Sequence, residues 1–508
     1  MSDDRIPVIV GAAQLVQRDA DPKEALEPLA MLLQVARGAA EDARAGDKLL
    51  RDLDTVGIVS VANWQEQNAP RFVAQHLGAQ PKYEYTSEMG GQIGVTMANL
   101  VAKKITQGET KAALIAGCNN LRTLVKAHQK GVALDWKTGG TGQPEMVGSL
   151  EPGSNELEAK YGMVMPPDVY PLFENAVRAA RGHSLDEHRA RLGKLFSRFT
   201  EVAAANPYAW FPIARSPEEI TTEVPSNRMI AYPYTKYMNA ILNTDQAAGL
   251  LMCSVAKARE LGIPEDRWVY WWGGAESQEE AWFPSERPSY ARCPSMLDAH
   301  RGALQNAGIG VDDLDRIDFY SCFPIAVEMA AEQLGLALDD PRGFTVTGGL
   351  PYAGGPASAY TVHSLCSMAD RLREKPSGKK GGAKGFVTGN GWYLTKHAAS
   401  VWSTERKPGD LPVGTLPSEL PSKAVATAPA KVDESASGAG TVEAYTVLYD
   451  RDGAPARGIV LGRTAEGRRF LANTPGDRAL LEGFVAAEQV GSKGKLSQQG
   501  GFTIFEPA

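Results

Sequence analysis

The stretch Gly348–Ala359 reads GGLPYAGGPASA, and four of its twelve residues are glycine. It follows a predicted strand-and-helix unit that ends near Leu336. Glycine gives access to backbone conformations that strain other residues, and proline is favoured in the first turn of a helix. We therefore predict a glycine-rich loop that leads into a helix.

The chain has 508 residues, which is too many for one compact core, so two to four domain-sized units are expected. Hydrophobic residues make up 43% and charged residues 22%, as in ordinary globular proteins. The net charge of −7 argues against a nucleic-acid partner. No window approaches eighteen consecutive apolar residues and no signal-peptide pattern opens the chain. The sequence predicts no membrane span and a cytoplasmic location.

Cysteine and histidine usage gives no metal or disulfide signal. No C-x-x-C pair is present, so we expect neither a zinc site nor a disulfide framework. Among the seven histidines only His183 and His188 are close, and their spacing is typical of a solvated helix face. The five cysteines are scattered: Cys118, Cys253, Cys293, Cys322 and Cys366.

A weak internal repeat relates the first part of the chain to the second. A strand that runs into small residues, an amphipathic helix, an apolar strand and a strand that stops at glycine recur in the same order. Strands that alternate with helices predict crossover connections and largely parallel sheets covered by helices. The paired segments are 8–13 and 269–275, 25–42 and 294–307, 52–61 and 313–322, and 112–117 and 385–391. The fold class is therefore predicted as α/β, with a duplicated unit.

Composition divides the chain further. Residues 122–233 are too long for an ordinary connection and favour an inserted helical loop subdomain. A Pro-, Ala-, Ser- and Gly-rich stretch predicts a linker, and the period-two alternation after it predicts a small β-barrel. The predicted units are 1–255 and 256–405 for the two halves, 406–440 for the linker and 441–508 for the barrel.

Two motifs resemble those of the thiolase superfamily. The run from Thr347 to Pro356 resembles N-G-G-x-x-x-x-G-H-P, with Gly355 at the histidine position. Met238–Ala248 resembles the N-x-S-x-x-N-D-G-A-A run that closes the first half of thiolases. Residues 7–402 are most similar in character to the sterol-carrier-protein-type thiolases. The resemblance implies two βαβαβαββ halves in α-β-α-β-α layers, and the tail resembles the OB-like domains that accompany thiolase-like proteins.

The resemblance also locates the catalytic positions, and all three are glycine. In the family a cysteine thiolate at a helix start attacks the acyl-CoA, with a histidine and a second cysteine as acid and base. The nucleophile position falls on Gly91, the histidine position on Gly355 and the second cysteine position on Gly389. A slip of one or two residues in the alignment reaches Gly90, Met89 or Gln92, and none of these is a nucleophile.

Cys322 is the candidate catalytic thiol that remains. It stands in Tyr320–Phe323, YSCF, where sterol-carrier-type enzymes carry H-D-C-F, so the resemblance implies an acid/base role. The alternative is a buried, inert cysteine at a strand end. His363 and His397 are the histidines that could replace the missing base, with packed histidines as the alternative. The expected pocket residues are Tyr320, Ser321, Phe323, Gly354, Pro356 and Asn390, and no metal ligand is expected.

Three functions are consistent with these residues. The favoured one is a thiolase-like protein of lipid metabolism that binds coenzyme A or acyl-CoA and has lost thiolysis and condensation. The others are an acetyl-CoA acetyltransferase-type acyltransferase that uses Cys322, and a scaffold that recruits a protein partner through its C-terminal domain. Lys126, Lys130 and Arg215 are the cations expected near the CoA phosphates. The family's dimer packs around the nucleophile loop, and because that loop is altered here, a monomer remains an alternative.

Overall fold

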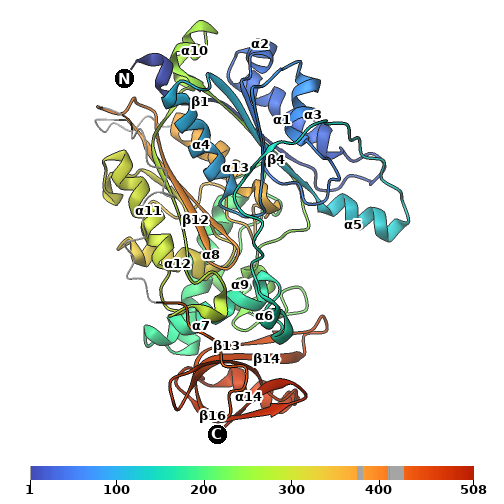
Figure 1. The fold of residues 1–508 in the computed structure, drawn as a ribbon, viewed down its shortest axis with the longest axis vertical. Helices are drawn as coiled ribbons and strands as arrows, with labels where there is room; N and C mark the ends of the chain where they lie inside the picture. The colour runs from blue at the N-terminus through green and yellow to red at the C-terminus, as the bar shows by residue number, and fades with distance from the viewer. Residues whose placement is uncertain (1, 375–381, 410, 412–427) are drawn as a thin grey trace.

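The computed structural model describes residues 2–374, 382–409, 411 and 428–508. Its body is an α/β thiolase-like fold built on a mixed sheet in the order β10-β11-β12-β9-β1-β8-β4-β2-β3-β5 (Figure 1). The strands are β1 (Pro7–Val16), β2 (Thr55–Ile58), β3 (Tyr83–Ser87), β4 (Ala112–Asn120), β5 (Glu145–Val147), β8 (Asp245–Ser254), β9 (Val269–Gln278), β10 (Arg316–Asp318), β11 (Lys384–Gly391) and β12 (Lys396–Ser403).

The expectation of largely parallel sheets is wrong. Only the two ends of the sheet are parallel, at β10–β11 and at β4–β2–β3–β5. The pairings between them, from β11 through β12, β9, β1 and β8 to β4, are antiparallel. The repeat pattern in the sequence includes neither β8 nor β12, and these two strands take part in every antiparallel pairing of this sheet except β1–β9.

Helices cover the sheet in layers. Helix α1 packs on β1, β8 and β4, and α11 packs on β9 and β12. Helices α4 and α13 contact each other and strands of both halves, so they form the central layer. The helices of the body are α1 (Pro28–Asp42), α2 (Gly46–Arg51), α3 (Ala69–Leu77), α4 (Ile93–Gln107), α10 (Val255–Glu260), α11 (Pro294–Ala307), α12 (Pro324–Gln333) and α13 (Tyr360–Glu374).

The predicted glycine loop leads into a helix as expected. Gly348, Gly349 and Gly354 all have positive φ angles, a conformation that favours glycine. A short 3₁₀ turn, η6 (Ala357–Ala359), then continues into α13. The other 3₁₀ turns are η1 (Asp3–Arg5), η2 (Lys236–Met238), η3 (Glu265–Arg267), η4 (Pro284–Glu286) and η5 (Val311–Asp313).

The inserted region is helical; its helices α6, α7 and α9 lie between the sheet and the C-terminal barrel in Figure 1, whereas α5 projects at the side of the sheet. Its long helix α8 includes the helix-forming run that the sequence indicated, and Ser184 caps its first turn by accepting a hydrogen bond from the Glu187 amide. The elements are α5 (Leu121–Lys130), α6 (Glu156–Tyr161), α7 (Pro166–Ala180), α8 (Leu185–Ala204), α9 (Pro217–Thr221), β6 (Met229–Ala231) and β7 (Tyr234–Thr235).

The C-terminal unit is a five-stranded β-barrel. Its strands follow the order β14-β15-β17-β16-β13, and a β13–β14 pairing closes it. Its elements are β13 (Gly438–Tyr449), β14 (Pro455–Thr464), β15 (Arg469–Asn473), α14 (Arg478–Ala486), β16 (Lys493–Gln499) and β17 (Phe502–Pro507). β13 begins before residue 441 because its first residues, largely glycine, pair through their backbone with β16. Residues 410 and 412–427 of the predicted linker lie outside the described residues.

The barrel contacts the inserted region closely. Asn175 of α7 donates to the Tyr445 carbonyl at 2.9 Å, and the amide of Tyr232 donates to the Val447 carbonyl at 2.9 Å. Arg178, only 2% exposed, forms an ion pair with Glu488. The hydrophobic core of the C-terminal half continues into barrel residues such as Leu461. Among the described residues, none of the helices has the length and hydropathy to span a membrane.

Candidate functional site

Gly91 lies in the turn between β3 and α4, so the position sits at a helix start as the sequence predicted. A Cβ atom placed on Gly91 would overlap the Tyr320 phenol and would lie 2.5 Å from the Asn390 carbonyl oxygen. The carbonyl of Gly91 accepts a hydrogen bond from the Thr361 hydroxyl at 2.9 Å, which fixes the turn against α13. The place of a side chain at position 91 is therefore taken by the ring of Tyr320.

Tyr320 is held in this position from several sides. Its amide donates to the Thr388 hydroxyl at 3.0 Å, and its ring packs edge-on against Tyr360 at 5.5 Å between ring centroids. Burial raises the pKa of Tyr320 well above its ordinary value, so the phenol stays neutral at physiological pH. The tyrosine is a fixed, uncharged wall of the site.

The other two glycines differ from each other in the space around them. Gly389, on β11, packs against the backbone of Gln92 so closely that a Cβ would overlap Gln92 Cα. Gly355 has more room, since a Cβ there would lie 3.2 Å from the Ile241 carbonyl oxygen. A side chain at 389 would require the start of α4 to move, whereas one at 355 needs only a small adjustment.

The motif run Met238–Ala248 connects these positions. The amide of Ala240 donates to the Cys322 carbonyl at 3.1 Å, and the amide of Gly355 donates to the Ile241 carbonyl at 2.9 Å. The structure thus brings the Gly91–Gly389 contact, Cys322 and the Gly355 loop into one region.

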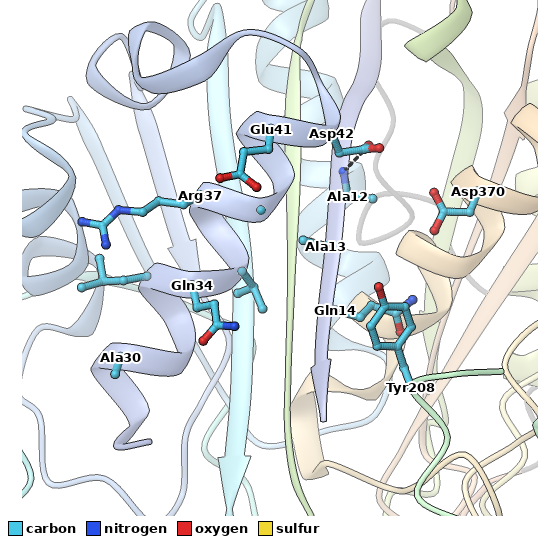
Figure 2. Close-up of a pocket in the computed structure, with 13 residues that line it drawn as sticks. Ala12, Ala13, Gln14, Ala30, Gln34, Arg37, Glu41, Asp42, Tyr208 and Asp370 are labelled. Atoms are coloured by element: carbon cyan, nitrogen blue, oxygen red, sulfur yellow. Dashed lines mark hydrogen bonds between the residues drawn. The ribbon is translucent and has the colours of Figure 1, made fainter. Parts of the chain in front are cut away.

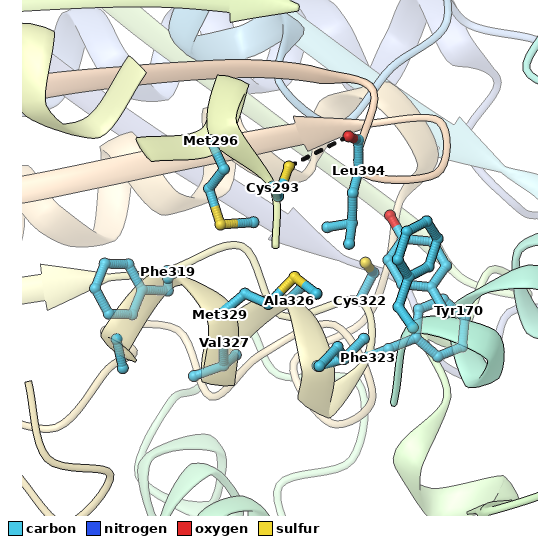
Figure 3. Close-up of a cluster of buried hydrophobic side chains, with 14 of the residues drawn as sticks. Tyr170, Cys293, Met296, Phe319, Cys322, Phe323, Ala326, Val327, Met329 and Leu394 are labelled. Carbon is cyan, nitrogen blue, oxygen red and sulfur yellow. Dashed lines mark hydrogen bonds between the residues drawn. The ribbon is translucent and has the colours of Figure 1, made fainter. Parts of the chain in front are cut away.

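Cys322 is buried in an apolar environment. Its side chain is 7% exposed, and Figure 3 shows it beside Tyr170, Phe323 and Leu394. Burial raises the pKa of its thiol to about 12. The rings of Tyr170 and Phe323 stack with 4.3 Å between centroids. The environment favours the protonated thiol and opposes the thiolate that nucleophilic chemistry needs.

The remaining predicted pocket residues make contacts that hold neighbouring segments of the chain in place. Asn390 donates to the Tyr170 hydroxyl at 2.8 Å and lies 3.9 Å from the Cys322 sulfur. Ser321, fully buried, accepts from the Leu350 amide at 3.4 Å. The carbonyl of Pro356 accepts from Ala359 in the turn before α13. Gly354 packs against the Gln246 side chain, which a Cβ at position 354 would overlap.

Neither alternative histidine faces Cys322 as a base would. His363 Nδ1 pairs with Gln14 Oε1 at 2.9 Å, and His397 Nε2 lies 3.3 Å from the sulfur of Cys293. Burial lowers the pKa of each imidazole to about 3. His183 and His188 do not share a solvated face as predicted, because His188 is buried against Glu174 at 2.6 Å.

Two charged groups behind the nucleophile turn were missed from the sequence. Glu88 and Lys396, both nearly fully buried, form an ion pair at 2.7 Å, and Gln92 donates to the same carboxylate at 2.7 Å. Lys396 also donates to the Met89 carbonyl at 3.1 Å. The sequence did not reveal this ion pair because its partners are far apart in the chain: Lys396, on β12, lies 307 residues after Met89. This network fixes the turn that carries Gly91.

One group has the spacing of metal ligands in the described residues: Glu174, His188 and Glu328, all buried. Arg181 pairs with Glu328 at 3.0 Å, and the Tyr234 hydroxyl donates to Glu174 at 2.6 Å. The Glu174–His188 distance of 2.6 Å is a direct hydrogen bond. We interpret the group as a buried hydrogen-bond network that joins α7, α8 and α12.

The expected cations have partners of their own. Lys130 pairs with Asp21 at 2.6 Å, Lys126 donates to the Ala20 carbonyl, and the Arg215 guanidinium lies over the Tyr237 ring. A hollow of about 880 Å³ lies between α1 and β1 (Figure 2) and is not lined by Gly91 or Cys322.

Comparison with known proteins agrees with this geometry. Over its whole length the chain matches the crystal structure of a monomeric SCP2-thiolase-like protein type 1 from Mycobacterium smegmatis, with 34% identity, complete coverage of both chains and a TM-score of 0.84. The chain belongs to this family. Residues 417–501 match the thiolase-like protein type 1 additional C-terminal domain, which is the barrel described above.

More distant relatives share the thiolase fold. The SCP2-thiolase-like chain is 24% identical over 332 residues to acetyl-CoA acetyltransferase of Schizosaccharomyces pombe, covering 55% of this chain and 81% of that protein. The Ltp2-ChsH2(DUF35) aldolase matches with 15% identity and a TM-score of 0.59, covering 79% of this chain and 99% of that one. Membership of the thiolase superfamily, predicted from the motifs, is confirmed.

Proposed function

We propose that this SCP2-thiolase-like protein does not carry out thiolysis or Claisen condensation. The observation that supports this most is the overlap between a side chain at position 91 and the Tyr320 phenol. A thiolase needs a thiolate there, at a helix start that lowers its pKa. Here the position has neither the thiol nor the space for one.

Cys322 is a poor replacement for that nucleophile. Its pKa is raised to about 12 by burial, whereas catalytic thiols have lowered values. In addition, among the described residues no histidine hydrogen-bonds its sulfur, since His363 and His397 pair elsewhere. We therefore consider an acyltransferase that uses Cys322 less well supported than a protein without thiolase activity.

We further propose that coenzyme A thioesters are the ligands. The relatives named acetyl-CoA acetyltransferase act on such esters by name, and the inserted helical region over Cys322 is kept. The scaffold function is favoured by a different observation, namely that Tyr320 fills the space over the turn at Gly91.

Two measurements on the full chain separate these functions. Calorimetric titration with coenzyme A and with acetyl-CoA should give saturable binding, and absence of binding at millimolar ligand would favour the scaffold. Intact-mass analysis after incubation with acetyl-CoA should show no added acetyl group. A mass gain that Cys322→Ala abolishes would establish the rearranged acyltransferase instead.

We also infer that the chain is a monomer, as the Mycobacterium smegmatis relative is by its description. In support, the outer edge of β3 is not open, because β5 pairs with it in parallel from Tyr85 to Ser87. The sheet then ends at β5, and an edge strand of only three residues offers a poor template for a second chain.

A further inference from the structure

A small internal cavity lies behind the glycine loop, on residues that the proposed function does not use. Its volume is about 10 Å³, and its lining includes Gln14, Tyr208, Gln246, Gly354, Tyr360 and His363. A water-sized group needs on the order of 10–15 Å³ of such volume. The cavity therefore has room for one non-hydrogen atom with its hydrogens.

Gln246 presents an acceptor to this cavity. Its Nε2 donates to the carbonyls of Tyr208 at 3.1 Å and Ala353 at 2.9 Å. Carbonyl oxygens only accept, so the orientation of the amide is fixed. Its Oε1 has no hydrogen-bond partner among the described residues, although the residue is 2% exposed.

His363 presents a second acceptor. Gln14 is oriented with its Nε2 toward the Ser367 hydroxyl at 3.1 Å and its Oε1 toward His363 Nδ1 at 2.9 Å, and in this orientation Oε1 accepts from Nδ1. The hydrogen of the neutral ring is then on Nδ1, which leaves the lone pair on Nε2. In the described part of the chain Nε2 has no partner, and the residue is 5% exposed.

The cavity adjoins the large cleft of Figure 2, because Gln14 and Tyr208 line both hollows. The cleft measures about 880 Å³, within the range of small-molecule sites. Tyr208 is half-buried. Among the described residues its backbone forms hydrogen bonds with Asn206 and Gln246, whereas its phenol hydroxyl forms none. A ligand that spans both hollows would require this ring to rotate, and the ring would offer it an aromatic face.

We propose that the cavity binds the planar –NH₂ group of a small neutral ligand whose remaining part lies in the cleft. The lining holds two acceptors without partners, Gln246 Oε1 and His363 Nε2, and one atom that carries two hydrogens can satisfy both, whereas a hydroxyl donates only one hydrogen. An ammonium group would bury its charge beside two neutral side chains, at high cost. Three carboxylates, Glu41, Asp42 and Asp370, line the cleft rather than the cavity, and Asp42 is already paired with Arg267 and Arg373. Primary carboxamides and ring amines share the required chemistry.

The test uses the full chain with benzamide and adenine as probes and benzoate as the matched control. Benzoate has the shape of benzamide but offers no hydrogen to the two acceptors. We expect calorimetry to show that benzamide or adenine binds at least about tenfold more tightly than benzoate, as one lost hydrogen bond predicts. Benzamide alone would identify a carboxamide site, and adenine alone a ring-amine site. Equal affinities, or no binding of either probe, would overturn the proposal and leave a structural water as the occupant.

Two variants test the role of His363, and an NMR measurement on the unmodified chain tests the same role without a substitution that could impair folding. His363→Phe keeps the ring shape without the acceptor and should remove the preference for benzamide over benzoate, while Tyr208→Ala should keep it. In histidine-labelled ¹⁵N spectra of the unmodified chain, one Nε2 resonance should shift with benzamide and not with benzoate. An unchanged set of seven histidine signals would contradict the proposal even if His363→Phe fails to fold.

Discussion

Gly91 and Tyr320 form a complementary pair, because the small residue makes room for the large one. The proposed absence of a catalytic thiol therefore involves Tyr320 as well as position 91. The motif resemblance predicts that Gly91 and Gly389 stand at the family's catalytic positions, and the structure places these two glycines close together. It could not show that the Tyr320 ring enters the same space, because side-chain direction depends on packing across strands.

The pair can be tested by a double-mutant cycle. Gly91→Ala should lower the free energy of unfolding by about 3 kcal/mol, since the new methyl group overlaps the phenol. Tyr320→Ala should cost a similar amount through lost packing, about 3 kcal/mol. Because the second change removes the overlap, the double variant should lose at least about 1 kcal/mol less than the sum. Additive losses in urea denaturation would show that the two residues do not compete for space.

The thiols give a second test at this scale. All five cysteines are buried, and burial raises the pKa of Cys322 to about 12. Thiolate is the reactive form, so native protein should be alkylated by iodoacetamide far more slowly than urea-unfolded protein. Mass spectrometry measures the extent of alkylation in both samples, and the Cys322→Ala variant shows how much of the label is on Cys322. Rapid labelling of Cys322 in the native protein would show an accessible thiolate.

Secondary-structure elements were predictable where they bury one continuous apolar face. β4 is buried along its whole length and was evident as an apolar run, and α11 was predicted at its observed bounds, Pro294–Ala307. β16 and α14 were missed. The strand reads KGKLSQQ, with mostly exposed residues, so its pairing with β17 rests on backbone hydrogen bonds that composition does not reveal.

Helix α11 carries a buried histidine with a clear pH consequence. His300 is 2% exposed, its ring lies parallel to Phe319 with 5.9 Å between centroids, and burial lowers its pKa to about 3. The unfolded chain binds a proton near pH 6.5 and the folded chain does not, so stability falls as pH falls from about 6.5 toward 3.

His300→Phe should remove this dependence. The fall in the free energy of unfolding between pH 6 and pH 4 should be less steep by about 1.4 kcal/mol per pH unit, measured by urea denaturation against the unmodified protein. The contributions of groups that titrate alike in the variant and in the unmodified protein cancel in this difference between the two slopes. The substitution of an exposed histidine, His128→Gln, serves as the matched control. Identical slopes for His300→Phe and the unmodified protein would mean that the imidazole titrates alike in both states.

The whole molecule consists of a thiolase-like body and a barrel that share an interface at α7. The division at residues 406–440 remains a prediction, and the composition between Lys407 and Gly440 still favours first cleavage there in limited proteolysis. The ion pair between buried Arg178 and Glu488, together with the shared core, predicts that both fragments stay together after the cut. Native size-exclusion chromatography should therefore show one unshifted peak. Separate elution of the barrel would support a tethered, independent unit.

The central claim is that a thiolase fold has been kept while its catalytic position has been filled by Tyr320. The most direct test is the rate at which the purified full chain cleaves acetoacetyl-CoA in the presence of coenzyme A. We predict no thiolysis above the rate of an enzyme-free blank, because a nucleophile and base that act together lose nearly all their rate when one is removed. Turnover comparable to that of ordinary enzymes, on the order of 10 per second, would contradict the account.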